Sequence, residues 1–326
     1  MSLALFSAKD FLWGDIRIRN MAQLQYFKSE QIADGSYRIE NSFSDKLPFG
    51  VYCYLITGEK YALLIDTMFG FGDLKAYCET LTDKPIRLVN THAHGDHFGG
   101  NYHFDSCYMH YRDIRYFMEV PEIKKEQIAD ELRKFLGEEY KDQIDADDGN
   151  FADTHNMKIY PIGDGDVFDL GDRKIEVFEV GGHTPGSVIL IDSKTRIAYS
   201  GDACNGNTLL DFNTCLPVSV YLQNLIRLKG IQNRFDIMYG GHEIFDPTII
   251  DEGIETAERV IEGTDDKYIA KGIMGTDTVY AAAKIDGAYE RADGKRFNMT
   301  YIPDKINGTD NHRQIITAES DVPVDC

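Results

Sequence analysis

A short histidine-rich segment, Thr91-His92-Ala93-His94-Gly95-Asp96-His97, follows an apolar run at Ile86–Asn90 that is typical of a strand. Side chains alternate between the two faces of an extended chain, so His92 and His94 are expected on one side. Gly95 allows a sharp turn, after which Asp96 and His97 can point back from another direction. Three imidazoles and a carboxylate in so short a segment predict two adjacent groups of metal ligands.

Three more candidate ligands occur further along the chain, each at the end of a predicted strand and beside glycines. They are His183 in Gly181-Gly182-His183-Thr184-Pro185-Gly186-Ser187, Asp202 after Tyr199-Ser200-Gly201, and His242 after Tyr239-Gly240-Gly241. Any one of them alone could be a simple turn residue. Their occurrence together with the cluster at 91–97 predicts a shared metal site.

The surrounding pattern predicts a layered α/β domain. Two apolar strands flank Gly58-Glu59-Lys60, which is a hairpin signal. Helices are expected at Leu74–Leu81 and Val218–Leu228, and strand patterns resume at Met157. Residues 1–25 are interpreted as an N-terminal extension and 26–247 as the catalytic domain.

Two segments of the chain are expected to be additions to that domain. The charged segment at about 111–156 predicts a helical insertion, either a solvated cap or a lid. Residues 248–326 are interpreted as a C-terminal extension with a helix at Ile249–Ile261 and strands around Val279–Ile285 and Phe297–Ile302.

The amino-acid composition limits the classes of molecule that the chain is expected to bind. The 326 residues include 34 Lys and Arg against 54 Asp and Glu, a formal charge of −20. Such a balance argues against binding nucleic acid or an anionic membrane, both of which attract basic proteins. There is no apolar run of about 18 residues and no signal-peptide pattern at the start. The six scattered cysteines are typical of reduced thiols, so a cytoplasmic location is expected.

The motifs H-x-H-x-D-H, Gly-His-Thr-Pro-Gly-Ser, Ser-Gly-Asp and Gly-Gly-His occur in this order over roughly Tyr26–Phe245. In this the sequence resembles the metallo-β-lactamase superfamily, in the broad hydrolase branch that includes glyoxalase II-like enzymes. The resemblance implies a four-layer αββα sandwich with the metal site at one edge of its two sheets. It implies that one metal is bound by His92, His94 and His183, that a second is bound by Asp96, His97 and His242, and that Asp202 bridges them.

The same resemblance implies two divalent metal ions and hydrolysis by a metal-bridging hydroxide. Imidazole and carboxylate ligands suit Zn, Fe or Mn, and without a thiolate nothing in the set selects zinc. We expect cleavage of an ester, thioester or lactone-like bond in a small molecule, with Asp96 as a candidate for proton transfer. Asp202 stands where true β-lactamases of the family have Cys or Ser, which argues against antibiotic hydrolysis.

Two other functions remain open at this stage. A phosphodiesterase could use the same metal pair, and a non-hydrolytic diiron oxidoreductase or sensor would use the same ligands for iron. The sequence also leaves the oligomeric state open, and a homo-oligomer is compatible with it.

Overall fold

The computed structural model describes residues 26–47, 49–119, 129–130, 133, 136, 157–272, 275–285 and 290–310. They form two compact units. The first comprises the described residues up to Glu179 with Gly186–Asn205 and Gln232–Pro247. The second comprises Val180–Pro185, Gly206–Ile231 and the described residues from Thr248 onward. The predicted extension at 1–25 and most of the predicted insertion at 111–156 lie outside the described residues.

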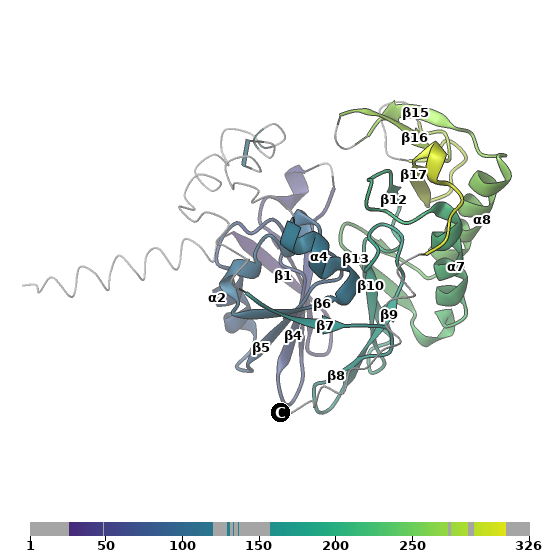
Figure 1. The fold of residues 1–326 in the computed structure, drawn as a ribbon. Helices are drawn as coiled ribbons and strands as arrows, with labels where there is room; N and C mark the ends of the chain where they lie inside the picture. Colours follow the sequence, from purple (N-terminus) through teal and green to yellow (C-terminus); the bar gives the residue numbers. More distant parts are fainter. Residues whose placement is uncertain are drawn as a thin grey trace, which may run out of the picture. The chain divides into compact units, whose positions relative to one another are not determined.

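The larger sheet of the first unit has seven strands, hydrogen-bonded in chain order (Figure 1). They are β1 (Phe27–Ala33), β2 (Ser36–Asn41), β3 (Tyr52–Thr57), β4 (Ala62–Ile65), β5 (Ile86–Val89), β6 (Ser106–His110) and β7 (Lys158–Ile162). The predicted hairpin is confirmed, because β3 and β4 pair antiparallel around Gly58-Glu59-Lys60. From β4 to β7 the strands are parallel. The residues that follow β4 and β5 therefore emerge at the same edge of the sheet.

The smaller sheet of this unit has six strands in the order β14-β13-β11-β10-β9-β8. They are β8 (Val167–Asp169), β9 (Lys174–Glu179), β10 (Val188–Asp192), β11 (Ile197–Gly201), β13 (Ile237–Gly240) and β14 (Ile244–Phe245). β11 and β13 are parallel neighbours, so their carboxyl ends also lie side by side.

The two sheets pack face to face, and alternate side chains of β3 lie in the core between them. Tyr54 and Ile56 belong to a buried cluster that they share with Val177 and Leu190 of the smaller sheet. The intervening residues of β3 point to the opposite face of the larger sheet. Burial of apolar side chains of this size stabilises the fold by ~1.5–3 kcal/mol each. The core between the sheets thus fixes the edge at which the strand ends meet.

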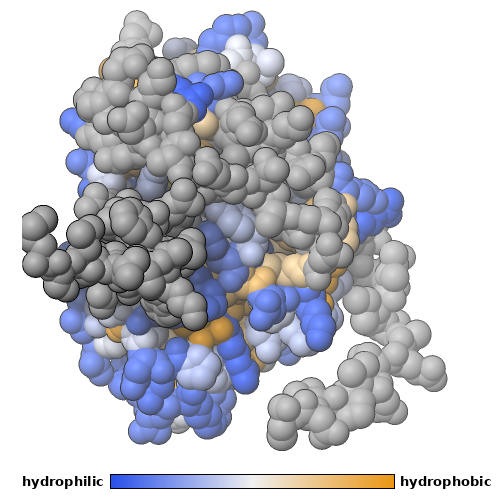
Figure 2. All heavy atoms as spheres, turned by 90° about the vertical axis from the view of Figure 1, so that its left-hand side faces the viewer, coloured by the Kyte–Doolittle hydropathy of each residue, from blue (hydrophilic) through white to orange (hydrophobic). Residues whose placement is uncertain are grey.

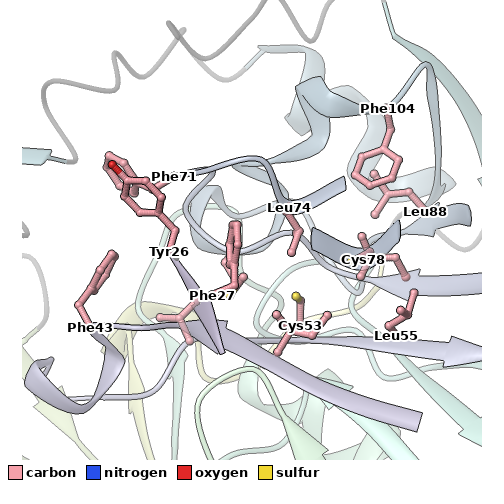
Figure 3. Close-up of a cluster of buried hydrophobic side chains, with 14 of the residues drawn as sticks. Tyr26, Phe27, Phe43, Cys53, Leu55, Phe71, Leu74, Cys78, Leu88 and Phe104 are labelled. Atoms are coloured by element: carbon pink, nitrogen blue, oxygen red, sulfur yellow. The ribbon is translucent and has the colours of Figure 1, made fainter. Parts of the chain in front are cut away.

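A helix covers part of the outer face of the larger sheet (Figure 3). α2 (Leu74–Leu81) begins at Asp73, whose carboxylate accepts a hydrogen bond of 2.9 Å from Ala76 N. Leu74 and Cys78 of this helix pack in one cluster with Cys53 of β3. The helix expected at Leu74–Leu81 is confirmed, and so is the α/β class.

The second unit combines two helices with a four-stranded sheet. α7 (Val218–Lys229) and α8 (Ile249–Glu262) pack against each other, and both were predicted within one residue of their observed ends. The sheet order is β12-β17-β16-β15, formed by Asn207–Leu210, Asn298–Tyr301, Asp277–Tyr280 and Tyr268–Lys271. The parallel pairing of β12 with β17 joins segments far apart in the chain, which sequence periodicity does not reveal.

The boundary predicted at 247/248 coincides with one limit of the two units, since Pro247 ends a segment of the first and Thr248 begins one of the second. Residues 206–231, however, group with the C-terminal part. The division into a catalytic domain and an extension stays a prediction.

Hydrophilic residues cover most of the coloured surface in Figure 2, as the charge of −20 would suggest. Among the helices described here, none has the length and apolar character needed to span a bilayer.

Candidate metal centre

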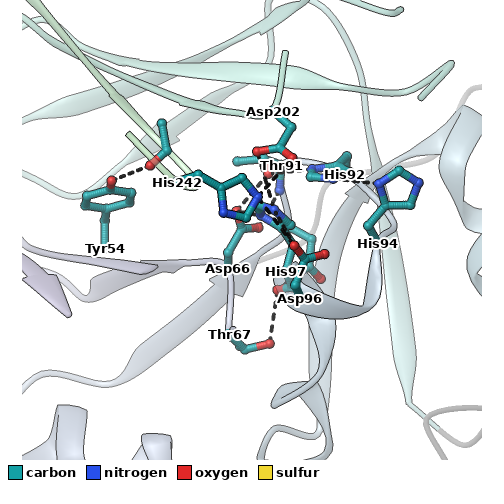
Figure 4. A network of polar contacts seen from close by, with 12 residues as sticks. Tyr54, Asp66, Thr67, Thr91, His92, His94, Asp96, His97, Asp202 and His242 are labelled. Carbon is teal, nitrogen blue, oxygen red and sulfur yellow. Dashed lines mark hydrogen bonds and ion pairs between the residues drawn. The ribbon is translucent and has the colours of Figure 1, made fainter. Parts of the chain in front are cut away.

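The histidine-rich loop begins where β5 ends and supplies four of the predicted ligands. His94 precedes the short helix α3 (Gly95–Phe98), whose turn carries Asp96 and His97 back toward His92. His92 Nε2 lies 3.1 Å from His94 Nδ1. The ring centroids of His92 and His97 are 4.1 Å apart, and His97 Nε2 lies 3.8 Å from Asp96 Oδ2. The loop thus brings the four side chains together (Figure 4).

Asp202 and His242 reach the same place from the smaller sheet. Asp202 directly follows β11, and His242 lies in the turn between β13 and β14. His242 Nε2 is 3.2 Å from Asp202 Oδ2 and 3.4 Å from Asp96 Oδ2. His97 Nε2 is 3.5 Å from Asp202 Oδ1. Figure 4 shows these side chains facing one another from different elements.

Two sets of three donor atoms within the first unit each lie within 4.8 Å of one another. The sets are His92, His97 and Asp202, and Asp96, His97 and His242. Imidazole nitrogens and carboxylate oxygens at this spacing can hold a divalent metal ion. How the residues divide between two ions, and whether Asp202 bridges them, stays a prediction.

His183, the seventh predicted ligand, belongs to the second unit, in the segment Val180–Pro185. Its Nδ1 donates a hydrogen bond of 2.7 Å to the carbonyl oxygen of Leu209. The loop is fixed further by the bond from Leu216 N to Gly182 O, 2.8 Å long. In the neutral ring this leaves Nε2 as the nitrogen with a lone pair, as in metal-binding histidines whose other nitrogen is held by a carbonyl. Its role as a ligand stays a prediction.

Asp66 contacts the cluster directly, although no sequence motif pointed to it. It follows β4, is buried, and has a positive φ of 63°. Its Oδ2 lies 2.9 Å from His97 Nδ1 and accepts the Thr91 hydroxyl at 2.7 Å, while Oδ1 accepts Thr91 N at 2.8 Å. A carboxylate on Nδ1 holds the proton there and directs Nε2 of His97 toward the cluster. The signal in the sequence was its position at a strand end, which it shares with Asp202.

The nitrogen atoms of His97 and His242 that face the cluster are suited to a cation. His97 is fully buried, and its Nε2 has no hydrogen-bond partner. His242 Nδ1 donates to the Gly50 carbonyl oxygen at 2.6 Å, which again leaves Nε2 for the cluster. A buried polar atom without a partner is costly, and a bound metal ion would remove that cost. These observations fit the metal ions that the motifs imply.

Gly241 makes room for this arrangement. A Cβ atom at this position would lie 2.3 Å from His97 Cε1 and 2.8 Å from Asp202 Oδ1. The carbonyl of Gly241 accepts a hydrogen bond from Tyr52 N at 2.8 Å, which anchors the turn that carries His242 to the larger sheet. The Gly-Gly-His motif therefore reflects a steric requirement.

The charges of the cluster shift its pKa values in opposite directions. Burial acts to lower the pKa of His97, but the carboxylates of Asp96, Asp202 and Asp66 outweigh it and raise the pKa to about 10. Burial also acts to lower the pKa of His242, but the carboxylates of Asp202 and Asp96 outweigh it and raise the pKa. The pKa values of Asp96 and Asp202 lie below their ordinary range, because the neighbouring imidazoles overcome the effect of burial. The carboxylates thus favour positive charge at this place.

Cys204, two residues after Asp202, is buried. Among the residues that the structure describes, none of the donor groups includes a cysteine. The two donor sets of the first unit consist of imidazole nitrogens and carboxylate oxygens.

The chain is similar to known proteins both in sequence and in fold. Residues 47–272 match the family described as the metallo-beta-lactamase superfamily. The chain is 25% identical over 229 residues to the human acyl-coenzyme A thioesterase MBLAC2, covering 66% of this chain and 79% of the human protein. A protein of the same name from Gallus gallus is 25% identical over 236 residues, with the same shares covered.

Solved structures show the same fold. A metallo-beta-lactamase family protein of Thermus thermophilus superposes with a TM-score of 0.50 at 16% identity, covering 72% of this chain and 82% of that one. A metallo beta lactamase of Erythrobacter litoralis also gives 0.50, at 15% identity, over 72% of this chain and 97% of that one. Together with the thioesterase relatives, the family match indicates a hydrolase. The chain belongs to the metallo-beta-lactamase superfamily.

Proposed function

We propose that this chain hydrolyses a thioester bond of a small molecule at a site that holds two divalent cations. The ligands in this proposal are His92, His94, Asp96, His97, His183, Asp202 and His242. The observation that carries it is the convergence of six of these side chains in the first unit, with the Nε2 atoms of His97 and His242 directed at carboxylate oxygens.

The choice of a thioester rests on the relatives. The human and Gallus gallus proteins, whose length the chain covers by 79% in each case, are named acyl-coenzyme A thioesterases. Acyl-coenzyme A is therefore the first substrate class to test. Since the donor set contains no thiolate, it suits Zn, Fe and Mn alike. A cytoplasmic location and a homo-oligomer stay predictions.

When bound, a pair of divalent cations lowers the pKa of water and polarises the carbonyl group under attack. The protein's part is to fix the donors in advance. Asp66 holds the proton of His97 on Nδ1, and the Gly50 carbonyl does the same for His242. Ligands whose second nitrogen is held in this way need little reorganisation when the site fills.

Asp96 is the residue we assign to proton transfer. Its side chain is 27% exposed, whereas those of His97 and Asp202 are 0% and 8% exposed. An ionised carboxylate that reaches solvent can accept a proton from water and then pass it to the leaving sulfur. Its lowered pKa means that it is ionised at neutral pH and would act as a relay rather than as a stored acid.

Relative turnover of four substrate classes tests the proposal. Protein loaded separately with Zn, Mn or Fe is assayed with acyl-coenzyme A of several chain lengths, a glutathione thioester, a lactone and an activated phosphodiester. We expect the highest kcat/KM for an acyl-coenzyme A, and loss of both metal content and hydrolysis in Asp202→Ala.

Two results would contradict the proposal. A higher kcat/KM for the phosphodiester would favour a phosphodiesterase. Redox-active iron without turnover of any ester would favour an oxidoreductase or sensor.

A further inference from the structure

A buried carboxylate outside the ligand set connects two parts of the metal centre. Asp113 lies on α4 (Tyr111–Glu119) and is 0% exposed. Its Oδ2 accepts a hydrogen bond of 3.0 Å from Ala93 N, and its Oδ1 accepts one of 2.7 Å from Gly186 N. One side chain thus holds the backbone of the loop at 91–97 and the backbone just before β10.

The first of these bonds acts directly on the ligands. Ala93 stands between His92 and His94, and its N–H lies in the peptide plane that joins it to His92, so a bond to this N–H fixes the backbone between the two histidines. Hydrogen bonds from backbone N–H groups to an ionised carboxylate are shorter and stronger than those between neutral groups. The bond therefore restrains the two rings through their shared backbone.

The second bond depends on a glycine. A Cβ atom at Gly186 would lie 2.6 Å from Asp113 Oδ1, closer than any ordinary contact. The same turn is tied to the histidine loop by the bond from Val188 N to Thr91 O, 2.9 Å long. The Gly186 position is therefore shaped to admit the carboxylate.

α4 touches the histidine loop through two further side chains. The rings of Phe117 and Phe98 meet edge to face with centroids 4.8 Å apart. The ring of Tyr116 meets the ring of His94 in the same way at 6.0 Å. Phe117 also packs in one buried cluster with Ala93. The helix thus contacts the loop and the short helix after it at Ala93, His94 and Phe98, and the carboxylate of Asp113 is a polar contact among these.

We propose that Asp113 is a positioning residue of the metal centre, which sets the geometry of His92 and His94 by holding Ala93 N and Gly186 N. This inference rests on the proposed metal site. It makes α4, the first element of the predicted insertion at about 111–156, part of the support of the ligands.

Asp113→Asn is the test. An asparagine keeps one acceptor oxygen, but its NH₂ group then faces the second backbone N–H, and one of the two bonds is lost. We expect Zn²⁺ affinity, measured by competition with a chelating dye, to fall about 10- to 100-fold, as when partners that orient metal ligands are removed elsewhere. We also expect the visible absorption spectrum of the Co²⁺-loaded protein to change, because it reports ligand geometry.

The matched control is Asp73→Asn, which alters a carboxylate that accepts Ala76 N at the start of α2, away from the ligands. It should lower the Tm and leave Zn²⁺ affinity and the Co²⁺ spectrum unchanged. If Asp113→Asn does not fold, Gly186→Ala displaces the same carboxylate without removing its charge, and we expect the same changes in affinity and spectrum.

The inference is overturned if the variant that folds, Asp113→Asn or Gly186→Ala, lowers only the Tm, with wild-type affinity and spectrum. A wild-type protein that binds neither Zn²⁺ nor Co²⁺ would refute the proposed function itself, which keeps the two failures distinct.

Discussion

Replacement of Asp66 by asparagine should move the proton of the neutral His97 ring from Nδ1 to Nε2. The backbone N–H of Thr91 cannot turn away, so the amide oxygen of the asparagine must occupy the place of Oδ1, which accepts that N–H at 2.8 Å. The NH₂ group then takes the place of Oδ2, 2.9 Å from His97 Nδ1. The Thr91 hydroxyl can rotate to accept a hydrogen bond from this NH₂ group. Nδ1 of His97 must also accept a hydrogen bond from it, so the ring proton moves to Nε2, the atom that faces the metal centre.

The magnitude follows from one lost hydrogen bond. To bind a metal, His97 must return its proton to Nδ1 and place it against the NH₂ group, both fully buried. A buried donor without an acceptor costs about 1–3 kcal/mol. At 1.4 kcal/mol for each factor of ten, metal affinity should fall roughly 5- to 150-fold. The fold should persist, because the asparagine still accepts from Thr91 N.

Two measurements check this prediction. Dye competition gives the dissociation constant for Zn²⁺. A long-range ¹H–¹⁵N correlation spectrum of the metal-free protein, recorded above the raised pKa of about 10 so that the His97 ring is neutral, reports which nitrogen carries the proton. Asp236→Asn, an exposed residue paired with Arg196, is the control for the loss of one negative charge. An Asp66→Asn protein that keeps wild-type affinity, with the proton still on Nδ1, would refute the reasoning.

Two further predictions concern a glycine and a pH dependence. Gly241→Ala places a Cβ atom against His97, so we expect the free energy of unfolding, measured by urea titration, to fall by about 1–3 kcal/mol, as for overpacked cores. The control is Gly163→Ala, where a Cβ atom would have no contact closer than 3.8 Å and should have little effect. Equal losses in both variants would count against the steric argument. For Glu252, burial acts to raise the pKa, but hydrogen bonds from the Phe297 and Arg296 backbone N–H groups and from the Arg296 side chain lower it below its ordinary value. The ionised Glu252 carboxylate therefore stabilises the fold at pH values above its pKa in the unfolded chain, about 4.3. This stabilisation is lost as the pH falls through the lower pKa that Glu252 has in the folded chain. Urea midpoints of Glu252→Gln should lie below wild type at pH 7 and converge with it in acid; a constant difference would contradict the assignment.

Local sequence signals were sufficient to predict that four candidate ligands of the first unit lie close together. His92, His94, Asp96 and His97 lie within one loop and turn, so their spacing alone predicts that they converge. Asp202 and His242 are distant in sequence, yet both follow a glycine at the end of a strand. Their neighbourhood depends on the parallel pairing of β11 with β13, which a strand prediction does not give, so the prediction relied on their motifs and on the family that these motifs resemble.

The supporting residues could not be found in this way. Asp66 has no histidine or glycine motif beside it, and its role appears only when β4 and β5 are known to be parallel neighbours. Asp113 lies inside a helix, where a charged residue is usually taken as solvated. The pairing of β12 with β17 likewise depends on contacts between distant segments, which no local pattern encodes.

The metal content of the purified chain tests the central claim most directly. Protein equilibrated with Zn, Mn or Fe, freed of unbound ions by gel filtration and analysed by plasma mass spectrometry should retain two ions per chain. His97→Ala, which removes the imidazole common to both donor sets, should retain fewer. A wild-type protein that retains none, or a His97→Ala protein that retains as much as wild type, would contradict the account.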